Sequence, residues 1–147
     1  MPDITMKHAQ TTAILLLWST LAFAQIPPLP VDILSPAEKK IGKAEIFPNF
    51  IVLRDSGGVR KGAIGAVMVD GRTRLFLVQS DDSRLLVGWA ENQRLFNAKG
   101  ELLGYYDWTP IWSYVYDKSM KKVGQAQCLA YQGICAAGIA GYLLGLL

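Results

Sequence analysis

The sequence contains a single histidine, His8, and only two cysteines, Cys128 and Cys135. Residues 25–147 therefore lack histidine, which excludes Ser-His-Asp and Cys-His catalysis and histidine metal ligation from that part of the chain. Two cysteines are too few for a structural zinc site, and no Cys-x-x-Cys redox motif is present. We predict no catalytic residues, no bound metal and no cofactor.

A strong charge of either sign is also missing, since the formal net charge is only +3. This value does not indicate a nucleic-acid partner. The aspartates from position 55 onward mostly fall at predicted turns, where their side chains close the loop, and no spacing among them indicates a catalytic pair. They are Asp55, Asp70, Asp81, Asp82, Asp107 and Asp117. We therefore predict a protein that is not an enzyme.

Residues 1–24 have the features of a secretory signal peptide. A weakly basic start with Lys7 precedes an apolar run from Ala13 to Phe23, and Ala22 and Ala24 fit an A-x-A cleavage site. The run is short for a membrane span of about 20 residues, although an uncleaved anchor is the alternative. We expect an exported protein, periplasmic or associated with the envelope, whose mature chain begins at Gln25.

Residues 25–49 read as a proline-rich spacer followed by a short helix. Prolines at positions 27, 28 and 30 favour extended chain. A serine, a proline and a glutamate then fit a capping box at the start of a helix, and a glycine is placed to end it. The residues of this pattern are Ser35, Pro36, Glu38 and Gly42.

Residues 50–127 predict a domain of β-hairpin repeats. Strand-length clusters rich in Val, Ile, Phe, Tyr and Trp alternate with turns of Asp, Asn, Ser and Gly. When LFNAKGELLG at 95–104 is aligned with VYDKSMKKVG at 115–124, the turn positions keep their class except that Gly100 aligns with Met120. The matching pairs are Phe96 with Tyr116, Asn97 with Asp117, Leu103 with Val123 and Gly104 with Gly124. Two looser copies precede them, so we expect about four hairpin-like units that complete one core.

The repeat of an aromatic residue, Asp or Asn, a turn, Gly, an apolar residue and Gly, followed by CAAGIAGYLLGLL, resembles the bacterial four-fold beta flower proteins. The resemblance covers about residues 50–147, and the chain departs from it at Met120 and in the irregular first two units. It implies hairpins around a pseudo-fourfold axis and no catalytic residues. The expected fold is a small, mainly β, single domain with a short N-terminal helix and an apolar C-terminal segment.

Residues 128–147 form a tail without a charged side chain. One interpretation is a buried strand or helix that closes the domain. Another is a membrane-associated helix, because the tail is about long enough to span a bilayer and Gly141 and Gly145 have small-xxx-small spacing. A third is a partner-binding or lipid-surface segment. The apolar tail is thus either packed on the domain or in contact with a membrane.

Export makes a disulfide between Cys128 and Cys135 a prediction of the sequence. The two residues can face each other across a hairpin. On one helix their spacing would separate them by roughly 10 Å, which is too far for a bond. A disulfide would therefore argue against a helical tail.

Aromatic residues are dense between positions 105 and 116, where YYDWTPIW joins two repeats. Such residues build either the core of a small β domain or contacts with sugars, peptides or lipid interfaces. Trp108 and Trp112 flank the Pro110 turn and, with Tyr106, are the candidate ligand-contact residues.

The function predicted from these patterns is that of an exported, non-enzymatic binding or structural module of the bacterial cell envelope, with a protein, glycan or lipid partner. The alternative is a membrane-attached envelope protein that is anchored or oligomerised through its C-terminal tail.

Overall fold

The computed structural model describes residues 29–79, 81 and 83–147, so the predicted signal peptide lies outside the described residues. Ten strands precede one helix. The strands are β1 (Leu29–Leu34), β2 (Lys40–Ile46), β3 (Phe50–Asp55), β4 (Arg60–Val69), β5 (Arg72–Val78), β6 (Arg84–Glu91), β7 (Arg94–Asn97), β8 (Leu102–Trp108), β9 (Trp112–Asp117) and β10 (Lys122–Gln127). The helix is α2 (Gln132–Leu143).

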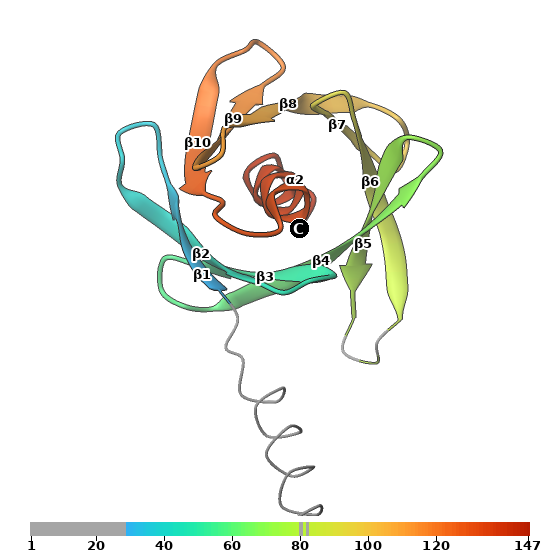
Figure 1. Cartoon of the computed structure of the whole chain (residues 1–147), viewed down its shortest axis with the longest axis horizontal. Helices are drawn as coiled ribbons and strands as arrows, with labels where there is room; N and C mark the ends of the chain where they lie inside the picture. Colours follow the sequence, from blue (N-terminus) through green and yellow to red (C-terminus); the bar gives the residue numbers. More distant parts are fainter. Residues whose placement is uncertain (1–28, 80, 82) are drawn as a thin grey trace, which may run out of the picture.

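The strands form a closed antiparallel barrel in which every strand pairs with its neighbours in sequence. The barrel closes where β1 meets β10, through the pairs Ile33 with Ala126 and Leu34 with Gln125. Closure leaves no free edge along the sheet. Figure 1, viewed down the barrel, shows the strands as a ring around α2. The prediction of a mainly β fold is confirmed.

The predicted N-terminal helix is wrong, because its residues form the first hairpin, β1 to β2. Ser35 does act as a cap, but it caps a turn: its Oγ accepts the backbone N–H of Lys39 at 3.2 Å. Glu38 has φ of 64°, which no helical residue adopts. The alternating apolar residues Val31 and Ile33 point into the barrel, with exposed fractions of 5% and 0%. This alternation, with period two, outweighs the local helix signal.

The barrel contains five hairpins, where about four hairpin-like units were expected. In three of the turns, Asp55, Asn97 and Asp117 accept through Oδ1 the backbone N–H groups of the residues two and four positions further on. The residue three positions on, which is Gly58, Gly100 or Met120, has positive φ in each case. Met120 therefore keeps the turn geometry of a glycine. One register shift accompanies each hairpin, as expected where an extra residue sits in a strand.

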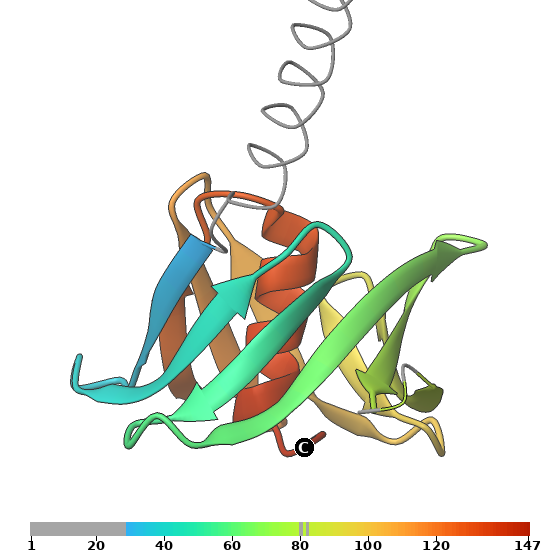
Figure 2. The ribbon, with the colours of Figure 1, turned by 90° about the horizontal axis from the view of Figure 1, so that it is seen from below.

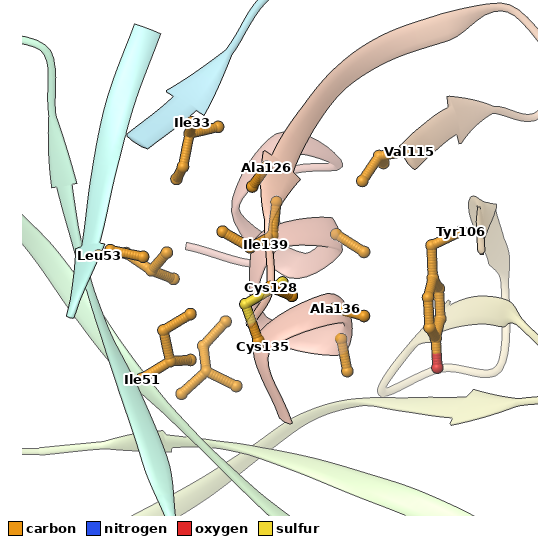
Figure 3. Close-up of a cluster of buried hydrophobic side chains, with 14 of the residues drawn as sticks. Ile33, Ile51, Leu53, Tyr106, Val115, Ala126, Cys128, Cys135, Ala136 and Ile139 are labelled. Atoms are coloured by element: carbon orange, nitrogen blue, oxygen red, sulfur yellow. A yellow bond between two sulfur atoms is a disulfide. The ribbon is translucent and has the colours of Figure 1, made fainter. Parts of the chain in front are cut away.

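The apolar tail is the centre of the core. Helix α2 runs along the barrel axis (Figures 1 and 2), and seven consecutive residues, Cys135 to Gly141, are buried. A helix enclosed on every side needs no polar face, which explains why the tail lacks charge. Side chains from the strands, among them Ile33, Leu53 and Val115, surround the helix in Figure 3.

Small residues in α2 reflect the narrow space inside the barrel. A methyl group added to Gly141 would lie 2.9 Å from Ile64 Cδ1, and one added to Gly138 would overlap Ile51. Of the two glycines that fitted a membrane-helix motif, Gly141 therefore allows the barrel wall to approach the helix, whereas Gly145 has open space around it. Among the described residues, no helix has both the length and the apolar character needed to span a membrane.

The end of the tail fits a ring of five glycines. The second strand of every hairpin carries a glycine that lies against a different apolar side chain between residues 142 and 147. The pairs are Gly42 with Tyr142, Gly62 with Leu147, Gly88 with Leu146, Gly104 with Leu144 and Gly124 with Leu143. Gly145, with φ of 88°, ends the helix and turns the last two leucines toward their partners. The ring and the tail thus form one packing unit.

Cys128 and Cys135 are bonded, with a Cα–Cα distance of 5.8 Å. The prediction of the bond is confirmed, but the argument that it excludes a helical tail is wrong. Cys128 lies between β10 and the helix, and only Cys135 belongs to α2. The chain therefore turns back between the two residues instead of rising along a helix. A closed loop of this size contributes about 2–3 kcal/mol to stability in the chain-entropy account, and it fixes the helix entrance to the end of β10.

Candidate functional site: grooves on the outside of the barrel

Because α2 and its surrounding side chains occupy the barrel axis in the described part of the chain, we sought binding sites on the outside and at the ends. The three aromatic residues predicted to contact a ligand occupy two separate places. Tyr106 and Trp108 belong to one pocket, and Trp112 belongs to another.

Tyr106 is mainly a core residue, with an exposed fraction of 7%. Burial raises the pKa of its hydroxyl to about 12. Its ring stacks on that of Trp108 with centroids 6.0 Å apart, and the Trp108 side chain is 42% exposed. The pair lines a pocket of about 510 Å³ beside the β4–β5 and β6–β7 turns. Of the two, Trp108 is the residue accessible to a ligand.

Trp112 lies on the other face of the sheet, because Ser113 and Val115 point inward and side chains alternate along β9. It lines a notch of about 420 Å³ at the barrel seam, together with Leu129 and residues of β1. The notch opens where β10 ends and the chain turns inward toward the disulfide. Both tryptophans thus flank the Pro110 turn as predicted, but they do not form one aromatic cluster.

The largest external groove, about 680 Å³, lies over the outer faces of β2, β3 and β4 and reaches the tip of the β5–β6 hairpin. Its floor includes Val52, which is 6% exposed, and Ala63, which is buried. Phe47 and Phe50 stack at one end with ring centroids 4.4 Å apart. The size and the apolar lining are those of a small-ligand site. We call this feature the arginine groove.

Three arginines and one carboxylate line the arginine groove: Arg54, Arg60, Arg84 and Glu45. Arg54 donates from Nε to Glu45 Oε1 at 2.6 Å and from Nη1 to the carbonyl oxygen of Gly58 at 3.3 Å. Among the described residues, Arg60 and Arg84 form no ion pair. The groove therefore carries an excess of positive charge beside apolar surface, where an incoming anion interacts more strongly than it would in bulk water.

The arginine groove was not predicted. Neither Arg60 nor Arg84 was among the candidate site residues. Arg54 and Arg84 lie 30 positions apart and on different hairpins. Only the pairing of β3 with β4 and of β4 with β5 brings these positions together.

The aspartates mostly have the turn roles expected of them. Asp55 and Asp117 close their hairpin turns, and Asp81 accepts the backbone N–H of Ser83 at 3.0 Å. Hydrogen bonds from Ser83 lower the pKa of Asp81. Asp107 is the exception, because it lies within β8 opposite Tyr114. In the part of the chain that the structure describes, no group of three or more His, Cys, Asp or Glu residues is placed to hold a metal ion.

Comparisons with protein-family models, with curated proteins and with solved structures found no match to this chain. The resemblance to the four-fold beta flower proteins stays a prediction. The arguments about function below depend only on the residues and their arrangement.

Proposed function

We propose that the protein is an exported, non-enzymatic binding module of the bacterial cell envelope that takes an anionic ligand in the arginine groove. The ligand carries a carboxylate, phosphate or sulfate group on an apolar or planar body. The single observation that carries this proposal is the grouping of Arg54, Arg60 and Arg84 around an apolar floor, where Glu45 is the one carboxylate among the described residues that line the groove.

The three guanidinium groups have different roles in this proposal. Arg54 is held by Glu45 and by the β3–β4 turn, so it presents a fixed positive charge. Arg60 and Arg84 reach the groove from two hairpins and supply the donors for the anion, since a guanidinium can bind a carboxylate or phosphate through two parallel hydrogen bonds. Val52 and Phe50 contact the body of the ligand.

The alternative function, a membrane-attached protein that uses its tail, is not favoured by a specific observation. The tail packs inside the barrel, where its side chains are already in contact with strands. The disulfide in turn supports export only weakly, because it fits an oxidising compartment without identifying one.

Titration of the full chain with pyrophosphate, followed by NMR of the arginine Nε–H groups, tests the proposal. We expect saturable shifts at Arg60 and Arg84. Replacing both, as Arg60→Gln with Arg84→Gln, should abolish the saturable component, whereas Arg94→Gln, outside the groove, should leave it unchanged. Equal, non-saturating shifts at all arginines, or no shifts, would overturn the assignment of the groove as an anion site.

A further inference from the structure

The turns of the five hairpins gather at one end of the barrel. Neighbouring strands run in opposite directions, so the turns that follow β1, β3, β5, β7 and β9 all lie at the same end. Figure 2 shows the C-terminus at this end as well. We call this end the hairpin-tip face and define it by the described residues 35–40, 55–61, 79, 81, 83–84, 97–101 and 117–122.

The entire net charge of the described residues lies on the hairpin-tip face. Its described segments contain nine basic and five acidic side chains, which gives +4. The remainder of the described residues contains five basic and five acidic side chains, which gives zero. The protein is therefore electrostatically polarised along the barrel axis, although its overall charge is small.

Large apolar side chains are exposed at and beside these same tips. Val59 is 60% exposed, Met120 is 59% exposed and Leu85 is 53% exposed, and they belong to three different hairpins. One exposed apolar residue needs no explanation. Three of them on separate hairpins, among lysines, form a surface of mixed apolar and cationic character.

Met120 is an exposed methionine in a backbone conformation that suits glycine. It has φ of 63°, in a position where two other turns carry Gly58 and Gly100. An L-residue other than glycine pays about 1 kcal/mol in this conformation, and an exposed side chain recovers little of that cost through packing. Its neighbours Lys118 and Lys121 are exposed, while Lys122 packs its ammonium group 4.7 Å from the centre of the Tyr114 ring. A strained, exposed methionine between lysines is consistent with a contact outside the chain.

From the charge, the apolar tips and Met120 together, we propose that the hairpin-tip face docks on an anionic lipid surface. The lysines meet the phosphate groups of the lipids, at about 1 kcal/mol for each residue near the surface. Met120 and Val59 enter the boundary between headgroups and acyl chains, where an apolar side chain leaves water. The opposite end also exposes apolar residues, including Met68 and Trp108, but it has no excess of positive charge to select an anionic surface.

The hairpin-tip face shares Arg60 and Arg84 with the arginine groove, so the test of this inference uses the β9–β10 turn, which is not part of that groove. The full chain is sedimented with vesicles of phosphatidylglycerol and phosphatidylcholine, and with vesicles of phosphatidylcholine alone. We expect binding to the anionic vesicles that weakens as salt increases. Lys118→Gln with Lys121→Gln should weaken it about tenfold to thirtyfold. Met120→Asn, which suits the positive φ, should weaken it a few-fold without unfolding the protein.

Met68→Ser and Arg94→Gln provide the matched control away from the hairpin-tip face and should leave binding unchanged. Equal binding to both kinds of vesicle, or equal loss in the control and the tip variants, would overturn the proposal. Displacement from the vesicles by inorganic phosphate alone would also contradict it, because it would indicate a site for a free anion. Failure of the pyrophosphate titration would leave these outcomes untouched.

Discussion

Gly104 of β8 lies against Leu144, so closely that a methyl group added to the glycine would lie 2.8 Å from Leu144 Cδ1. The same added group would overlap the carbonyl oxygen of Tyr116. We therefore expect Gly104→Ala to lower the free energy of unfolding by about 1–3 kcal/mol, as overpacking does. Urea denaturation measures the change. Gly57→Ala, at an exposed turn, should stay within about 0.5 kcal/mol of the parent, and an equal effect of the two substitutions would contradict the packing of the tail against the ring.

Two glycines of α2 give an internal test of the enclosed helix. Alanine favours a helix over glycine by up to about 1 kcal/mol, and Gly133 has open space around it. Gly133→Ala should therefore be neutral or stabilising. Gly138→Ala should instead be destabilising by about 1–3 kcal/mol, because its methyl group would overlap Ile51. Thermal unfolding of both variants measures the difference, and a stabilising Gly138→Ala would show that Ile51 does not confine the helix.

Because Gly100 and Met120 occupy equivalent turn positions with positive φ, exchanging the residue type at each should have opposite effects on the free energy of unfolding. Gly100 has φ of 83°, so Gly100→Met should lower the free energy of unfolding by about 1 kcal/mol. Met120→Gly should be neutral or raise it by up to about 1 kcal/mol, since relief of strain is offset by the entropy that glycine gains in the unfolded chain. Parallel urea denaturation of the two variants checks this. Destabilisation by Met120→Gly would mean that the methionine side chain makes a contact needed for folding.

Tyr106 should make the free energy of unfolding fall as the pH becomes alkaline. Burial raises its pKa to about 12 in the folded protein, compared with about 10 in an unfolded chain. The neutral form is thus favoured by folding, so the contribution is fully present below pH of about 10 and is lost as the pH rises through about 12. At pH of about 11 the loss is about 1.4 kcal/mol. Unfolding free energies at neutral and alkaline pH, compared between the parent and Tyr106→Phe, isolate this tyrosine from the others. Equal pH dependence of the two proteins would place Tyr106 in solvent.

Local sequence was sufficient to predict the hairpin turns, but not to predict how the hairpins assemble into a barrel. The Asx pattern at Asn97 and Asp117 determines a turn through hydrogen bonds within five residues, so it could be recognised directly. Ser35 and Glu38 satisfy either a helix cap or the same kind of turn. Whether these residues form a helix or a turn depends on two facts: Ile33 faces the core, and it pairs with Ala126 of β10 across the barrel seam. Neither fact can be predicted from the residues around Ser35.

The packing of the tail and the position of the arginine groove could not be predicted from local sequence either. The glycines of α2 weaken a helix by propensity alone, yet the barrel wall requires a small residue at Gly138 and Gly141 and stabilises the helix in return. The arginine groove depends on Arg54, Arg60 and Arg84 meeting across strands. Because these arginines lie on different strands, their spacing in the sequence does not indicate that they share a site. The two cysteines were sufficient to predict the disulfide. They did not show that α2 begins between them, at Gln132, which allows the bond and a helical tail together.

Hydrogen exchange of the full chain tests most directly whether the apolar tail is the core of the barrel. We predict that the backbone amides of Cys135 to Gly141 exchange only through global unfolding, at the same rate as those of Ile51 and Val115 in the strands. Protection of the strands together with rapid exchange in α2 would contradict the account, because it would show that the barrel forms without the helix inside it.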